Sequence, residues 1–214
     1  MLNLKQLISL TAVFLLLCLV SIFFVDQPLI FFIDQHAGAL QPVFKEMTSY
    51  TDLITGYTYS KYLFGIIVLV GGVVMVVIDK NLTRAKYFFF VSVTEFASTS
   101  TVGMLKNVFG RERPSSIIGT KQFVQTFWIA GGDSFPSGHV GRYFGIFLHL
   151  AVLFPTYRMA WLIVPVYISL GRIILNLHFL SDVLTSLYLV IVVTSLFGYL
   201  FKVKPLEERL LQES

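Results

Sequence analysis

Residues 7–25 read LISLTAVFLLLCLVSIFFV, an apolar run without a charged side chain. A helix of about 20 predominantly apolar residues crosses the hydrocarbon core of a bilayer. The stretch therefore predicts a membrane-spanning helix. A secretory signal peptide is the alternative, but no small-residue cleavage site follows at residues 24–28, so we expect an uncleaved helix.

Five further apolar stretches follow the first one along the chain. They are residues 62–78, 87–108, 139–154, 159–175 and 179–201. No internal repeat or compositional break divides the chain. The sequence predicts an all-α fold, a bundle of six transmembrane helices in a single domain over residues 1–214.

The composition agrees with a lipid environment and excludes several other classes. The chain is 56% hydrophobic and 13% charged, whereas soluble domains carry about 25% charged residues. The net charge of +4 is small and its basic residues are scattered, so we expect no nucleic acid partner. Cys18 is the one cysteine, which excludes a disulfide framework and a cysteine metal site.

Three polar clusters interrupt the apolar chain, each at the end of an apolar stretch. The first runs from Lys106 to Pro114, the second is Pro136-Ser137-Gly138-His139, and the third runs from Arg172 to Asp182. Together they offer fixed cations, two imidazoles, a hydroxyl and a carboxylate. This inventory suits the binding of a phosphate and an attack on it.

The third cluster contains a candidate nucleophile. His178 and Asp182 are four residues apart, which places them on one face of a helix. A carboxylate bonded to one ring nitrogen fixes the tautomer and leaves the other lone pair free. The alternative is a structural pair that caps the last apolar helix. Arg172 offers a planar fork of donors for phosphate oxygens, or it snorkels to water.

The second cluster opens an apolar helix, and helix N-termini attract anions. Ser137 supplies a hydroxyl, Gly138 lets backbone approach a ligand, and His139 can protonate a leaving oxygen. An ordinary serine cap is the alternative for Ser137. In the first cluster, Lys106 and Arg113 can reach a phosphate, or they simply flank a membrane segment.

Two further charged residues, Arg142 and Glu95, lie near the clusters, and we expect different roles for them. Arg142 follows His139 by three residues and lies on a similar helix face, which makes it a possible substrate contact. Glu95 lies deeper in its apolar stretch, so we expect a buried structural residue bonded to the Ser/Thr patch at residues 98–101.

Lysines and arginines in the short loops indicate the orientation. With the proposed site cations set aside, their count favours both termini in the cytoplasm. All three polar clusters then lie on the outer side of the membrane.

The joint pattern is more specific than its parts. Lys106-x6-Arg113-Pro114, Pro136-Ser137-Gly138-His139 and Arg172-x5-His178-x3-Asp182 resemble the three-part signature of the type 2 phosphatidic acid phosphatase (PAP2) superfamily, whose integral members have six helices. One departure is Gly171, where the family usually has a serine that helps to bind phosphate.

The resemblance implies a phosphohistidine mechanism without a metal or other cofactor. His178 would attack phosphorus, Asp182 would orient it, and His139 would protonate the leaving lipid oxygen. The phosphate-binding groups implied are Lys106, Arg113, Ser137, Gly138 and Arg172.

The substrate expected from the resemblance is a phosphorylated lipid in the inner membrane, reached from the periplasmic face. The continuation Val140-Gly-Arg142-Tyr143 looks closest to the lipid A phosphatase and polyprenyl diphosphatase types. Phosphatidylglycerol phosphate and phosphatidate stay as alternative substrates. A non-enzymatic phospholipid-binding or transport protein is the competing class, although binding alone would not need both histidines.

Overall fold

The computed structural model describes residues 4–120, 127–129 and 131–203. These residues form helices and connecting turns without any strand, so the predicted all-α class is confirmed. The predicted domain 1–214 and both chain termini extend into stretches outside the described residues.

The helices of the described residues follow one another in chain order. They are α1 (Leu4–Val20), a π-helical turn (Ser21–Val25), α2 (Asp26–His36), α3 (Gln41–Ile54), α4 (Leu63–Val77), α5 (Leu82–Phe109), α6 (Pro114–Thr120), α7 (Gly138–Leu153), α8 (Arg158–Ile174) and α9 (Leu180–Leu200). Two 3-10 turns, Gly38–Leu40 and Pro155–Tyr157, precede α3 and α8.

Within the described part of the chain, four helical segments are long and apolar enough to cross a membrane. They are Lys5–His36, Leu82–Ile118, Pro155–Ile174 and Leu180–Leu200. The other two predicted spans are also helical, but α4 has 15 residues and α7 has 16. The chain is thus built as a multi-pass membrane protein, while the predicted count of six spans is not confirmed.

The first helix continues beyond its predicted end at residue 25. The π-helical turn leads directly into α2, so helical structure runs on past Asp26. The Asp26 side chain is fully buried against α9 rather than exposed to water. Its charge therefore does not end the helix.

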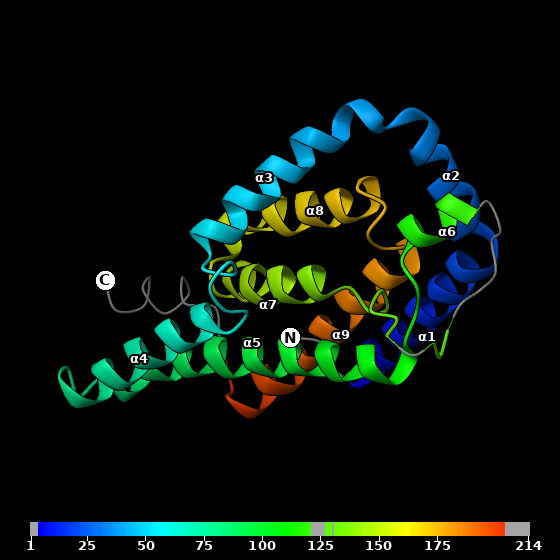
Figure 1. The fold of residues 1–214 in the computed structure, drawn as a ribbon. Coiled ribbons are helices and arrows are strands. Elements are labelled where there is room, and N and C mark those ends of the chain that lie inside the picture. Colours follow the sequence, from blue (N-terminus) through cyan, green and yellow to red (C-terminus); the bar gives the residue numbers. More distant parts are fainter. Residues whose placement is uncertain (1–3, 121–126, 130, 204–214) are drawn as a thin grey trace.

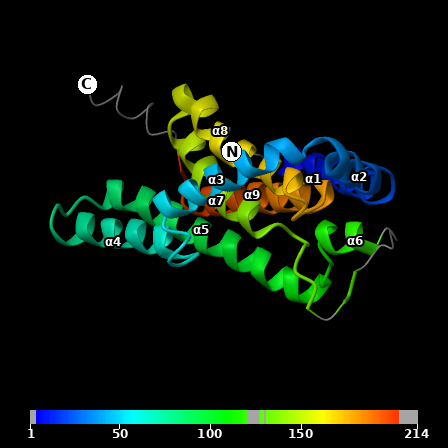
Figure 2. The same cartoon turned by 45° about the horizontal axis from the view of Figure 1, so that its top comes forward.

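The bundle is arranged around α7, which lies between α5, α8 and α9 (Figure 1). Helix α4 packs along α5, and α1 packs along α9. Helix α3 passes over α8 in both views (Figure 2). The core between α2, α7, α8 and α9 includes Ile33, Phe144, Ile173 and Val190. This packing brings the ends of α5 and α8 to the starts of α7 and α9.

Local capping explains where two site-bearing helices begin and end. Asn81 caps α5 by accepting the Arg84 N–H at 2.9 Å. Gly110 ends α5 in the left-handed region at φ +47°, which glycine adopts without strain. The Asp182 carboxylate accepts the Phe179 N–H at 2.8 Å at the start of α9, so a predicted site residue also fixes its own helix.

Candidate active site

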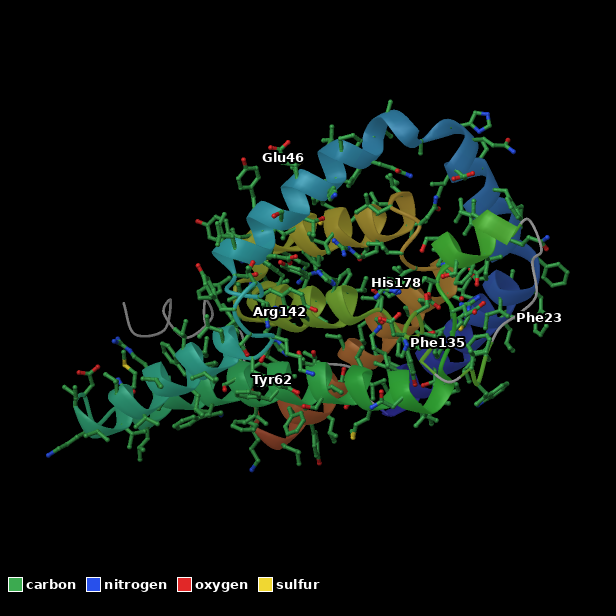
Figure 3. All side chains as sticks on the ribbon, in the orientation of Figure 1. Phe23, Glu46, Tyr62, Phe135, Arg142 and His178 are labelled. Carbon is green, nitrogen blue, oxygen red and sulfur yellow. The ribbon has the colours of Figure 1, made fainter. Side chains whose placement is uncertain are left out.

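His178 lies in the turn between α8 and α9 and is 3% exposed. Its Nδ1 lies 2.8 Å from the Ser134 carbonyl oxygen. A carbonyl oxygen only accepts hydrogen bonds, so Nδ1 carries the hydrogen and Nε2 keeps its lone pair. Figure 3 shows His178 close to Phe135, at the beginning of α7 and α9.

The expected contact between His178 and Asp182 is present but long. Asp182 Oδ2 lies 3.5 Å from His178 Nδ1, at the limit of hydrogen bonding. The backbone of Ser134 therefore orients the imidazole more strongly than the carboxylate does. Burial away from water lowers the pKa of His178 to about 4, although Asp182 acts to raise it. The imidazole is consequently neutral near pH 7.

The Asp182 carboxylate is fully buried and joins several segments at once. Besides the Phe179 N–H, it accepts hydrogen bonds from Ser134 Oγ at 2.6 Å and from Arg111 Nη1 at 2.6 Å. Hydrogen bonds to a charged group are about twice as strong as neutral ones. Asp182 is therefore held rigidly behind His178.

Arg111 is a site residue that the sequence reasoning did not single out. Its side chain is buried and also donates to Ser181 Oγ at 2.7 Å and to Asp26 Oδ2 at 2.9 Å. Its guanidinium stacks on the Phe179 ring at 3.8 Å. A usable signal existed, because Asp26 directly follows an apolar run and ionisable residues at membrane depth need partners.

Ser137 and Gly138 begin α7, as expected. The Ser137 side chain is fully buried but makes no cap hydrogen bond. Its hydroxyl has no partner within the described part of the chain, so it does not act as an ordinary helix cap. A Cβ on Gly138 would meet Lys106 Cε at 3.4 Å. The glycine thus keeps Lys106 close to the N-terminus of α7.

Lys106 and Arg113 meet at one residue, Asp133. Arg113 holds the Asp133 carboxylate with two hydrogen bonds, from Nε at 2.7 Å and Nη2 at 2.6 Å. Lys106 Nζ donates to the Asp133 backbone carbonyl oxygen. Hydrogen bonding from Arg113 holds the pKa of the Asp133 carboxyl below its usual range. A fork that binds a carboxylate in this way also matches two phosphate oxygens.

The segment before α7 is fixed to the end of α5 by backbone hydrogen bonds. Ile129 N–H donates to the Gly110 carbonyl oxygen at 2.8 Å, and Ser134 N–H donates to that of Arg111 at 2.8 Å. A side chain on Gly132 would collide with the Gly110 backbone. Glycine there permits the close approach that delivers Asp133 and Ser134 to the site.

Arg172 lies near the end of α8 and is 7% exposed. Its Nε has no hydrogen-bond partner among the described residues. Its carbonyl oxygen accepts the N–H groups of Leu177 and His178 at 3.1 and 3.2 Å. The turn after α8 therefore fixes the backbone positions of both Arg172 and the candidate nucleophile His178. Beside it, a Cβ on Gly171 would lie 3.0 Å from Phe44 Cδ1 of α3, which explains why a small residue stands there.

His139 is partly exposed at the start of α7, and its Nε2 lies 3.2 Å from Asp52 Oδ2 of α3. Arg142 lies one turn farther along α7 and is fully buried. It donates to the carbonyl oxygens of Thr55 and Lys61 and lies 3.3 Å from Glu95 Oε1. Figure 3 places Arg142 toward Tyr62, away from His178. These contacts give Arg142 a structural role, and a contact between Arg142 and substrate stays a prediction.

Residues 86–204 match the family described as the PAP2 superfamily, which is more than half of the chain. The chain belongs to the PAP2 superfamily. All three polar clusters lie inside this PAP2 match, whereas Asp26 and Asp52 precede it. Membership of the PAP2 superfamily supports a phosphatase.

Two curated relatives of this PAP2 protein are both named lipid A 1-phosphatase. The protein from Rhizobium etli is 29% identical over 175 residues, covering 72% of this chain and 74% of the relative. The protein from Rhizobium johnstonii is 33% identical over 131 residues, covering 56% of this chain and 51% of the relative. No solved structure matches the chain.

Proposed function

We propose that this protein is a metal-independent lipid phosphatase that works through a phosphohistidine intermediate. The observation that carries the proposal is the state of His178. Its Nδ1–H is held by the Ser134 carbonyl oxygen, its ring is neutral, and its Nε2 lone pair is available. Three cations lie at the helix ends that meet at this site. Lys106 is in the last turn of α5, Arg113 follows α5, and Arg172 is in the last turn of α8.

The chemistry proceeds in two steps in this proposal. His178 Nε2 attacks the terminal phosphorus, and the bond from phosphorus to the leaving oxygen breaks with its electron pair on that oxygen. The leaving oxygen is the hydroxyl oxygen of the lipid in a monophosphate and the bridging oxygen in a diphosphate. His139 gives this oxygen a proton. Water then attacks the phosphohistidine, His139 takes the proton from water, and inorganic phosphate leaves with His178 restored.

Fixed donors stabilise the charge that develops on the phosphate oxygens. Ser137 Oγ and Arg172 Nε are buried and have no hydrogen-bond partner among the described residues. In this proposal they bind the phosphate oxygens. Arg113 and Lys106 add charge from the end of α5, and the N-terminus of α7 adds its backbone donors. Preorganised electrostatics of this kind usually supplies the largest catalytic term.

The substrate we propose is a lipid A phosphate or undecaprenyl diphosphate, reached from the periplasmic face of the inner membrane. The two curated relatives named lipid A 1-phosphatase support a phosphorylated lipid. We assign the termini to the cytoplasm, because the loop cations favour that side.

Phosphate release by the purified full-length protein tests the proposal. The substrates are lipid A, undecaprenyl diphosphate, phosphatidylglycerol phosphate and phosphatidate, each assayed with excess EDTA. His178→Ala is the inactive variant, and its rate of phosphate release should fall by more than about 1,000-fold. His36→Ala is the matched control, since His36 is an exposed histidine bonded to the Phe32 carbonyl.

We expect full release in EDTA, a phosphoenzyme that is stable in base, and loss of both in His178→Ala. Restoration of activity by a divalent metal would contradict metal independence. Lipid binding without phosphate release, unchanged in His178→Ala, would instead favour a carrier.

A further inference from the structure

The candidate proton donor is held by a residue outside the three polar clusters. Asp52 lies on α3, and its Oδ2 is 3.2 Å from His139 Nε2. An ionised carboxylate only accepts hydrogen bonds, so Nε2 carries the hydrogen of this contact. Nδ1 is then the ring nitrogen that can exchange a proton with substrate.

Asp52 is itself fixed by a second hydrogen bond. The Tyr143 hydroxyl donates to Asp52 Oδ1 at 2.6 Å, and Thr55 Oγ1 lies 3.1 Å from the same hydroxyl. Partial burial acts to raise the pKa of the Asp52 carboxyl, but the hydrogen bonds from His139 and Tyr143 outweigh burial and leave it lowered. The carboxylate is therefore charged and oriented by both of its oxygens.

Other groups around His139 complete its environment. The Tyr57 ring meets the imidazole edge-on at 4.6 Å between centroids. Arg172 and Lys106 are the cations that act on the ring. Burial first, and these two cations after it, disfavour a protonated imidazole. The Asp52 carboxylate is therefore the group that would allow His139 to hold a proton.

We propose that Asp52, supported by Tyr143, is the positioning residue that orients His139 and stabilises its protonated form during phosphate transfer. This inference rests on the proposed function and adds to it. Asp52 precedes the PAP2 match, and it belongs to a helix that passes over α8 (Figure 1). The arrangement makes α3 part of the active site.

The test compares substrates that differ in their need for a proton. Asp52→Asn keeps the shape of the side chain and removes its charge. The first turnover is measured on the active lipid of the panel and on p-nitrophenyl phosphate, whose leaving group departs without protonation. Glu46→Gln is the matched control, because Glu46 is an exposed carboxylate on α3 (Figure 3).

We expect Asp52→Asn to slow the lipid reaction by at least about tenfold and to spare the aryl phosphate. The alkaline limb of the pH profile should move to lower pH, since the protonated imidazole loses its carboxylate. Tyr143→Phe should give a smaller change in the same direction. The double variant Asp52→Asn with His139→Ala should turn over the lipid no more slowly than His139→Ala alone.

Three results would overturn the inference while leaving the phosphatase intact. They are wild-type rates in Asp52→Asn, faster lipid turnover in that variant, or an equal loss on both substrates without a shift of the pH limb. A wild-type protein that releases no phosphate from any lipid would instead refute the proposed function itself.

Discussion

Arg111 donates to Asp182 at 2.6 Å, and its other terminal nitrogen binds Asp26 at 2.9 Å. All three side chains are buried. One guanidinium thus ties the first residue of α2 to the start of α9, directly behind His178. Removing one partner of a buried ion pair leaves an uncompensated charge, which costs about 3–5 kcal/mol.

Arg111→Met should therefore destabilise the protein strongly, because Asp26 and Asp182 would both lose their cation. We expect a much lower midpoint of thermal unfolding in detergent, together with loss of phosphatase activity. Arg84→Met is the control, since Arg84 is an exposed arginine at the start of α5. Equal midpoints for the two variants would show that the Arg111 network does not hold the fold.

Arg142→Met should also destabilise the protein, because Glu95 would be left buried without its partner. The double variant Arg142→Met with Glu95→Leu should recover part of this loss, since an apolar pair often replaces a buried ion pair at little cost. Thermal unfolding of the three proteins measures the effect. A double variant less stable than Arg142→Met would argue against the pairing.

Gly171→Ser would introduce the hydroxyl that PAP2 members usually carry. Here its Cβ would press against Phe44 at 3.0 Å, and overpacking costs about 1–3 kcal/mol. We expect lower stability and lower activity from the single variant. Adding Phe44→Leu should relieve the contact and restore both, and failure to do so would place the cause elsewhere.

His178 should titrate far below an ordinary histidine. Burial lowers its pKa from 6.5 to about 4, Lys106 and Arg113 also lower it, and Asp182 acts to raise it. The neutral nucleophile is therefore lost only as pH falls through about 4. The unfolded chain binds the proton first, so folding stability from this group falls between pH 6.5 and 4 and is complete above 6.5.

NMR of protein labelled with ¹⁵N-histidine measures this titration directly. The chain has four histidines, and the spectrum of His178→Ala identifies the missing signal. A midpoint near 6.5 for His178 would contradict the buried, neutral imidazole.

Much of the site could be predicted from short-range patterns. The four-residue spacing of His178 and Asp182 indicated that they lie close together, although His178 lies in the turn before α9 rather than on the helix. Proline and glycine marked the start of α7. Arg111 could not be assigned in this way, because its partners Asp26 and Asp182 are distant in sequence and meet only when α2 packs against α9. Asp52 was missed for the same reason, since α3 and α7 are far apart in sequence and Asp52 meets His139 only in the folded bundle.

The sequence by itself determined the helical class, the membrane environment and the three clusters, because apolar length and local spacing act within one helix. Tertiary structure determined the hydrogen-bond and ion-pair partners of the site residues. It brought His178 Nδ1 to the Ser134 carbonyl oxygen, Asp182 to Arg111, and Arg142 to Glu95. A buried polar group needs a hydrogen-bond partner within about 3 Å. Here the partners lie on other helices, so only the packing of the helices against one another determines them.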